Sequence, residues 1–201
     1  GLLRPERVAT LVPAIKQAIG AMPLQIHTHC NSGLAPYVVV QAVENGVDVV
    51  HTATSTLANG VSHSPTELFA ANCRRRGYEV DIDLGPVREV AERLAYIAEK
   101  EGKPVGTPNE YDEFHYHHQC AGGMVSNLAY QLETIGIAHR LEEILEEAGQ
   151  VRMDLGYPIV ISPFAQYIVT MAILNVMGRD QGKQRYDTVP DEVRLYVRGG
   201  Y

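Results

Sequence analysis

The sequence has no tryptophan, only three cysteines and no apolar run long enough to cross a membrane. Its longest apolar segment, residues 164–178, is shorter than the roughly 18 consecutive apolar residues that a membrane-spanning helix requires. The cysteines are odd in number and irregularly spaced, which is not the pattern of a disulfide-stabilised secreted domain. This cysteine pattern favours a cytoplasmic protein in a reducing compartment.

Positive charge is also scarce. The 17 Lys and Arg residues face 24 Asp and Glu residues, so the net charge of −7 argues against a nucleic acid as partner. The densest acidic cluster is interpreted as a solvated helix face; it comprises Glu142, Glu143, Glu146 and Glu147. With 201 residues, 45% of them hydrophobic, the chain suits one globular domain or a large piece of one.

The first part of the chain alternates helical and strand-like hydrophobic patterns. Helical spacing over residues 8–19 precedes an apolar strand at 23–29, a helix that Asn31 or Ser32 can cap, and a second apolar strand at 47–53. This alternation is typical of parallel α/β folds, in which strands covered on both faces are almost continuously apolar. The pattern alone does not separate a barrel from an open sheet.

After about residue 80 the patterns become mostly helical. A short strand is predicted at 157–163, and residues 103–121 are predicted to be a structured loop near a site. Helices are predicted at 87–97, 124–135, 138–149, 164–177 and 190–198. The second half is therefore interpreted as a helical extension packed on an α/β core.

The segment "QIHTHCNSG", residues 25–33, carries the first chemical signal. Side chains alternate along a strand, so His27 and His29 share one face. They end the predicted strand, and the carboxyl ends of parallel strands carry the active site in α/β folds. Two such imidazoles can bind one metal ion, although two hydrogen-bonded histidines in a polar barrel mouth fit the same pattern. A metal site also needs three or four protein ligands, so this pair is at most half of one.

Five other side chains are candidates to complete such a site, and their spacing does not choose among them. Cys30 follows His29 directly, so its side chain starts toward the opposite face of the strand. The next strand ends at His51, which can point into the same mouth. Three more residues lie on loops that can reach it, namely His63, His118 and Cys120.

Residues 24–67, from "LQIHTHC" to "SHSPTE", and 115–166, from "HYHHQCAGG" to "ISPFAQ", carry a resemblance. They resemble the carboxyltransferase of biotin-dependent 2-oxo acid carboxylases and decarboxylases, such as pyruvate carboxylase, oxaloacetate decarboxylase and transcarboxylase. That family lies within the metal-dependent barrel set that includes HMG-CoA lyase. The resemblance implies an α/β fold. Residues 1–80 would be the C-terminal part of a TIM (β/α)8 barrel, and residues 81–201 a mostly helical conserved carboxylase extension.

The resemblance also implies a divalent metal ion, of which zinc, cobalt and manganese are the candidates. His27 and His29 match the family's two histidine ligands. The remaining ligands, an aspartate and a lysine, would precede Gly1, because "GLL" resembles the end of the lysine segment. An N-terminal barrel half, missing here or supplied by a separate chain, is therefore expected.

Two residues of the extension match functional positions of the family. Ser162 stands where the family has a threonine that carries a proton between biotin and the 2-oxo acid. A serine before Pro163 also suits a helix cap, which is its ordinary structural role. Gln166 matches a position for binding substrate or cofactor where members have lysine or glutamine.

The implied activity is transfer of CO2 between carboxybiotin and a small 2-oxo acid, pyruvate or oxaloacetate, through a metal-stabilised enolate. Biotin would arrive on a separate carrier domain. The other implied partners are biotin carboxylase or decarboxylase subunits and further copies of the chain.

Several positions depart from the family pattern, and they keep two alternatives open. They are Cys30, His51, the pair Cys120-Ala121, and Ala165. One alternative is a biotin-independent, metal-dependent lyase or aldolase of the wider barrel set. The other is a diverged, non-catalytic scaffold subunit.

Overall fold

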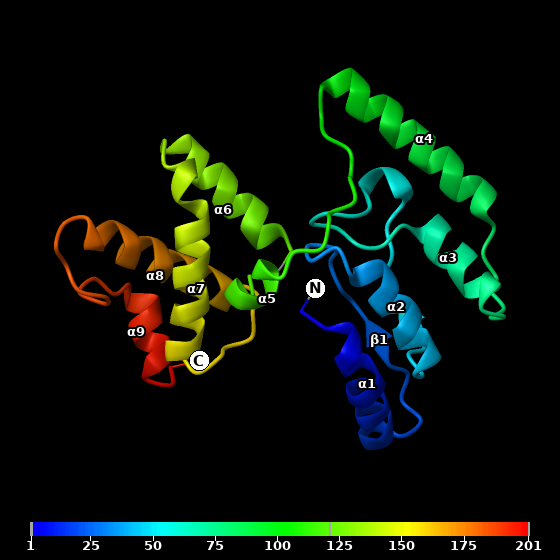
Figure 1. Ribbon diagram of the computed structural model, residues 1–201, viewed down its shortest axis with the longest axis horizontal. Coiled ribbons are helices and arrows are strands. Elements are labelled where there is room, and N and C mark those ends of the chain that lie inside the picture. The colour runs from blue at the N-terminus through cyan, green and yellow to red at the C-terminus, as the bar shows by residue number, and fades with distance from the viewer. Residues whose placement is uncertain (1, 121, 201) are drawn as a thin grey trace. The chain divides into compact units, whose positions relative to one another are not determined.

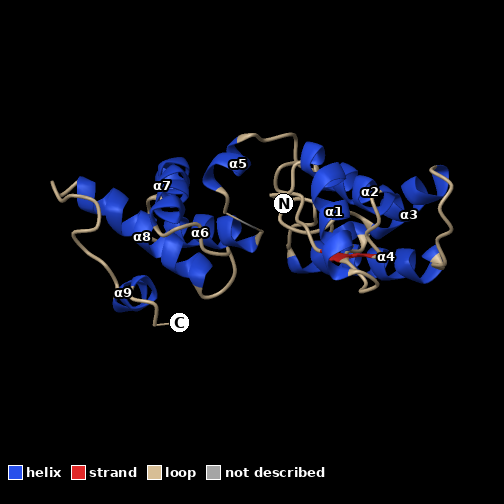
Figure 2. Ribbon diagram, turned by 90° about the horizontal axis from the view of Figure 1, so that it is seen from below, coloured by secondary structure: helices blue, strands red, loops and turns tan. Residues whose placement is uncertain are grey.

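The computed structural model describes residues 2–120 and 122–200, and the chain forms two compact units that meet in sequence between Glu113 and Phe114. Helices dominate both units, and the two short strands lie in the first (Figures 1 and 2). The boundary expected at residue 80, where the barrel would give way to the extension, stays a prediction. None of the described helices is both long and apolar enough to span a bilayer.

The first unit follows the predicted alternation of helices and strands. Its elements are α1 (Pro5–Ile19), β1 (Gln25–Ile26), α2 (Ala35–Glu44), β2 (Val49–Val50), the 3-10 helix η1 (Ser55–Leu57), α3 (Thr66–Arg75) and α4 (Leu84–Glu101). Strands β1 and β2 are parallel, with Gln25 opposite Val49 and Ile26 opposite Val50. Two parallel neighbouring strands joined by a helix form the βαβ unit of α/β folds.

Both strands are shorter than the apolar runs predict. The reason is that the chain beyond Ile26 leaves β2 and bonds to the loop before α3. The Cys30 N–H donates to the Ser62 carbonyl over 2.8 Å, and the His51 N–H donates to the Ile26 carbonyl at the end of the ladder over 3.0 Å. Regular pairing therefore stops where the histidine segment begins.

The predicted cap of α2 at Asn31 or Ser32 is wrong. The helix begins later in the chain, with Leu34 as its N-cap, because residues 31–33 form a turn closed by a hydrogen bond from Gly33 N–H to the Cys30 carbonyl. Gly33 has a φ of 78°, and a Cβ there would lie 2.7 Å from the Glu110 carbonyl oxygen. A glycine is therefore required at this turn by both conformation and space.

The core of the first unit lies between the strands and helices α1 and α2, which flank β1 in Figure 1. Val8 and Val12 are four residues apart on α1, and Val38 and Ala42 repeat that spacing on α2. Residues four apart share one helix face, so each helix presents an apolar stripe to the strands. Val47, at the start of the β2 segment, completes the buried cluster.

Asp48 ties α1, β1 and β2 together. Its Oδ2 accepts the Leu24 N–H and the Lys16 ammonium, each over 2.7 Å. These two hydrogen bonds favour the ionised carboxylate and lower the pKa of Asp48. The strand pair is thus held in register by a charged side chain at the edge where both strands begin.

The lowered Asp48 pKa predicts an acid-sensitive part of the stability. A carboxyl group with a lowered folded-state pKa stabilises the fold above its ordinary pKa, and this contribution is lost as pH falls through the folded-state value. The unfolding free energy of the wild type should fall between about pH 6 and pH 3, and we expect it to fall less in Asp48→Asn. Urea unfolding at several pH values measures the unfolding free energy of each variant, with Asp81→Asn, at an exposed position, as the control. An equal fall in both variants would contradict the assignment.

The second unit is all-helical over its described residues. It contains α5 (Phe114–His118), α6 (Gly123–Thr134), the 3-10 helix η2 (Ala138–Arg140), α7 (Leu141–Asp154), α8 (Phe164–Arg179) and α9 (Asp191–Val197). The strand predicted at 157–163 is wrong, because the described part of this unit offers no strand for it to pair with. Its backbone is bonded instead to α7, through Tyr157 N–H to the Arg152 carbonyl and Arg152 Nε to the Pro158 carbonyl.

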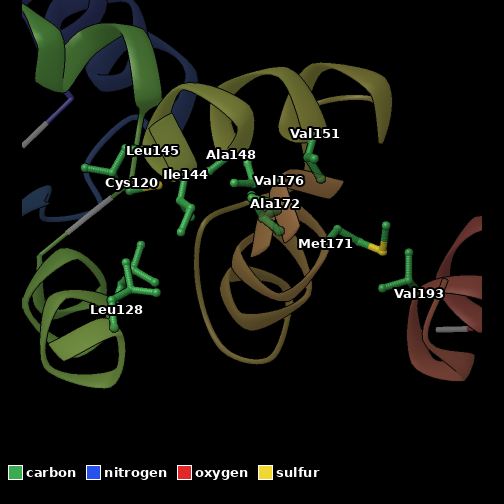
Figure 3. Close-up of a cluster of buried hydrophobic side chains, with 12 residues drawn as sticks. Cys120, Leu128, Ile144, Leu145, Ala148, Val151, Met171, Ala172, Val176 and Val193 are labelled. Carbon is green, nitrogen blue, oxygen red and sulfur yellow. The ribbon is translucent and has the colours of Figure 1, made fainter. Parts of the chain in front are cut away.

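Helices α7 and α8 form the centre of the second core (Figure 3). Ile144, Ala148 and Val151 follow one face of α7 and are fully buried, as are Met171 and Val176 on α8. Full burial of the larger of these side chains contributes roughly 1.5–3 kcal/mol each before the cost of ordering them. Packing of these faces therefore specifies the helical unit.

The acidic face of α7 was predicted to be solvated, and this holds for only part of it. Glu142 and Glu146 are not paired in any ion pair described for this helix, whereas Glu143 pairs with Arg140 over 2.8 Å. Glu147 accepts from Asn175 and from Arg185, each over 2.8 Å. Half of the cluster therefore links α7 to neighbouring segments.

Leu132 on α6 provides a test of the second core, because it is fully buried whereas Tyr130 on the same helix is 72% exposed. We expect Leu132→Ala to lower the unfolding free energy by about 2–5 kcal/mol through lost burial and the cavity left behind. Tyr130→Ala is expected to change it by under about 0.5 kcal/mol. Urea unfolding followed by circular dichroism measures both, and similar losses would contradict this packing.

Candidate functional site

Four histidines meet at the carboxyl edge of the two parallel strands. His27 and His29 follow β1, His51 follows β2, and His63 lies on the loop between η1 and α3. The ring centroid of His63 lies 4.3 Å from that of His27 and 4.7 Å from that of His29. The shared face predicted for His27 and His29 is present, since their ring centroids are 5.2 Å apart.

Three of these rings have the arrangement of metal ligands. One nitrogen each from His27, His29 and His63 lies within 4.8 Å of the others. The Nε2 atoms of His27 and His29 are 3.3 Å apart. Two imidazole nitrogens about 2.0–2.1 Å from one tetrahedral ion are about 3.3–3.4 Å apart, so this pair fits a single ion.

Main-chain carbonyls orient two of the rings. His29 Nδ1 lies 2.6 Å from the Val61 carbonyl oxygen, and His63 Nδ1 lies 2.8 Å from the Thr28 carbonyl oxygen. A carbonyl oxygen only accepts hydrogen bonds, so each Nδ1 carries the proton. In the neutral form of each ring, Nε2 then carries the lone pair, which is the arrangement of histidines that bind metals.

The surroundings of His27 favour its neutral form. Partial burial lowers its pKa first, and the positive charges that His63, His29 and His51 would carry lower the pKa further. Neutral imidazole is the form that binds a metal. The Nδ1 of His27 lies 2.8 Å from the Nδ1 of His51, whose Nε2 contacts the Gln25 side chain.

The cysteine next to these histidines points elsewhere. Cys30 is 2% exposed, and its Sγ lies 3.9 Å from the Ser64 hydroxyl. Burial raises the pKa of its thiol, which disfavours the thiolate that metals bind. Cys30 is therefore a core residue in the described structure.

Two further candidates lie in the second unit. The Nδ1 of buried His118 accepts the Cys120 backbone N–H over 2.9 Å, and burial raises the pKa of the Cys120 thiol to about 12. These contacts give both residues local structural roles. Ala121, the other half of the predicted departure, lies outside the described residues, as does Gly1.

Ser162 and Gln166 line one pocket of the second unit, at the start of α8. The pocket has a volume of about 240 Å³, and Asn127, Gln131 and Thr170 add polar groups to its wall. Helix α8 has Pro163 as its N-cap, and the described residues show no side-chain hydrogen bond capping it. The Ser162 hydroxyl is therefore not used as a helix cap and lines an accessible pocket.

Sequence reasoning could not single out His63 from the other loop residues. Its position depends on main-chain bonds, Asn59 N–H to the His63 carbonyl over 2.7 Å and Cys30 N–H to the Ser62 carbonyl over 2.8 Å. Such bonds leave no pattern of residue types. The sequence showed only that His63 lies on the loop after the second predicted strand, within reach of the same edge.

The C-terminal part of the chain, residues 116–201, matches the family model described as the conserved carboxylase domain. The whole chain is 36% identical to part of a pyruvate carboxylase subunit of Methanocaldococcus jannaschii, covering 35% of that protein. It is also 34% identical to part of the 2-oxoglutarate carboxylase large subunit of Hydrogenobacter thermophilus, covering 30% of it. Over 88% of the chain it is 33% identical to the methylmalonyl-CoA carboxyltransferase 5S subunit of Propionibacterium freudenreichii, covering 35% of that protein. The chain thus spans about a third of the length of these curated relatives.

A solved structure confirms the predicted fold class. The carboxyl transferase domain of Rhizobium etli pyruvate carboxylase, determined with pyruvate and biocytin, superimposes with a TM-score of 0.85. The likeness covers 97% of this chain and 33% of that chain at 22% identity. The fold is therefore that of part of such a domain, a partial TIM barrel followed by a helical extension.

The histidine geometry predicts which substitutions abolish metal binding. We expect His27→Ala or His29→Ala to remove it, because each deletes an Nε2 donor of the pair. Cys30→Ala should leave binding largely intact, because its sulfur lies in the core. Metal content of the purified protein, measured by inductively coupled plasma mass spectrometry, checks all three. Metal loss in the Cys30 variant alone would contradict the assignment.

Proposed function

We propose a carboxyltransferase role for this protein, because residues 116–201 match the conserved carboxylase domain and the whole chain resembles part of carboxylase and carboxyltransferase subunits. It would move CO2 between carboxybiotin and a small 2-oxo acid such as pyruvate or oxaloacetate. The observation that carries the proposal is the convergence of His27 and His29 at the carboxyl ends of parallel strands. That edge carries the active site in barrels of this kind.

His27 and His29 are proposed to hold a divalent metal through their Nε2 atoms. A bound metal would supply Lewis-acid polarisation of the substrate carbonyl. Imidazole nitrogens suit zinc and cobalt, and also manganese where oxygen ligands accompany them. The Val61 carbonyl, through the His29 Nδ1–H, fixes the direction from which that ring binds.

Ser162 is proposed to carry the proton that leaves or returns to the methyl carbon of the 2-oxo acid. A hydroxyl group both donates and accepts, so it can accept one proton while it donates another and stay neutral. Gln166, one helical turn further along α8, adds an amide to the same pocket for binding substrate or biotin. Because an amide is neutral, it would contribute hydrogen bonds without competing for the transferred proton.

Biotin on a separate carrier domain and a biotin carboxylase or decarboxylase subunit are the proposed partners, together with an N-terminal barrel half and further copies of this chain. The named relatives, all of which are called subunits, support an assembly of several chains. The cytoplasm is the proposed compartment, supported by three cysteines that are buried and free of disulfides among the described residues.

Ser162 gives the direct test of the mechanism. We expect Ser162→Ala to lower kcat for carboxyl transfer by about 10²–10⁴-fold, the usual contribution of a positioned proton carrier. Ser162→Thr should retain most activity, because threonine keeps the hydroxyl. The assay follows isotope exchange between pyruvate and oxaloacetate in the assembled protein with its biotin carrier.

The control measurement is metal content, which both Ser162 variants should retain. Full activity in Ser162→Ala would contradict the proton-carrying role alone. Failure of the metal-loaded wild-type assembly to exchange any 2-oxo acid would contradict the carboxyltransferase proposal.

A further inference from the structure

We infer that His63 is a third protein ligand of the metal site, so that three imidazoles of this chain form one binding face. The inference rests on the proposed metal-binding role of His27 and His29 and adds a ligand that sequence resemblance does not supply. The ion bound there would be a divalent cation that prefers nitrogen ligands.

The distances place His63 inside the cluster. Its ring centroid lies closer to His27, at 4.3 Å, and to His29, at 4.7 Å, than those two lie to each other, at 5.2 Å. The three rings are inclined by 45° to 75° to one another, as expected where donors approach one point from different directions. His63 is also half-buried, so its ring is confined by the loop and not free in solvent.

The hydrogen bonding of His63 matches that of a metal ligand. Its Nδ1 donates to the Thr28 carbonyl over 2.8 Å, just as the Nδ1 of His29 donates to the Val61 carbonyl over 2.6 Å. The two contacts are reciprocal, since each of the two segments supplies a carbonyl to the histidine of the other. Each ring is thus oriented through Nδ1, which leaves Nε2 as the atom that would face a metal.

The loop that carries His63 is built to hold this position. Asn59 adopts a φ of 68° and Gly60 a φ of 52°, so the chain reverses sharply before Val61. Asparagine and glycine are the residues that tolerate this left-handed conformation. The turn is closed by hydrogen bonds from Asn59 N–H to the His63 carbonyl and from Ser62 N–H to the Asn59 carbonyl.

His51 differs from His63 in its geometry and is assigned a positioning role. Its ring centroid lies 6.3 Å from that of His63, and its Nδ1 faces the Nδ1 of His27 at 2.8 Å. When the proton of this pair is on His27, the Nε2 of His27 is available to the metal. His51 therefore orients His27 from behind instead of joining the binding face.

Three imidazole ligands give the site a distinct chemistry. Imidazole adds no negative charge, so neutralisation of a divalent cation would be left to its other ligands. Such a face favours zinc or cobalt over magnesium, which prefers oxygen ligands. It also favours an anionic oxygen ligand, and a 2-oxo acid carries a carboxylate next to its carbonyl.

The test loads the intact protein with zinc, measures affinity by competition with a chromophoric chelator, and counts imidazole ligands by X-ray absorption at the zinc edge. We expect His63→Gln to raise the Kd by more than about 100-fold and to remove one imidazole from the count. His51→Ala should raise the Kd by about 10–100-fold, as for other orienting groups, with the count unchanged. His139→Gln, at an exposed histidine of the second unit, is the matched control and should change neither.

Glutamine at position 63 keeps a donor for the Thr28 carbonyl, and an unchanged melting temperature shows that the loop still folds. An unchanged imidazole count in His63→Gln would overturn the inference, whatever its affinity. If His27→Ala nevertheless loses zinc, the proposed metal site stands and only the role of His63 fails. If wild type and His27→Ala bind zinc equally, the proposed metal role itself fails.

Discussion

The arrangement of the first unit depends on a main-chain hydrogen bond, from the Cys30 N–H to the Ser62 carbonyl. It ends the pairing of β1 with β2 and attaches the loop after η1 to the histidine segment. Together with the hydrogen bonds of His29 to the Val61 carbonyl and of His63 to the Thr28 carbonyl, that attachment fixes His63 beside His27 and His29. The same bond turns the backbone so that the Cys30 side chain enters the core while the neighbouring imidazoles face outward.

The α/β class and the His27–His29 pair were predictable because both follow from local periodicity. Apolar runs mark buried strands, and an i, i+2 spacing on a strand implies a shared face. Strand length was not predictable, since pairing ends where a distant loop competes for the backbone. The same reason explains the false strand at 157–163, which is apolar enough for a strand but has no partner among the described residues.

The second unit prepares its pocket in a different way. Ser162 and Gln166 stand at the start of α8, and the buried face of that helix is packed on α7 through Met171, Ala172 and Val176. A long, well-packed helix holds Gln166 in its first turn more firmly than a loop can, and Ser162 lies directly before its N-cap. Resemblance pointed to these two positions, whereas residue spacing does not reveal that they share a pocket lined by residues of α6 and α8.

The carbonyl groups that orient His29 and His63 belong to the backbone, and this affects how the site can evolve. Replacing the side chain of Val61 or Thr28 leaves the accepting oxygen in place. Adding or deleting a residue between Asn59 and His63 would move one acceptor and one ring at once. The site should therefore tolerate drift in residue identity along this loop while tolerating almost no drift in its length.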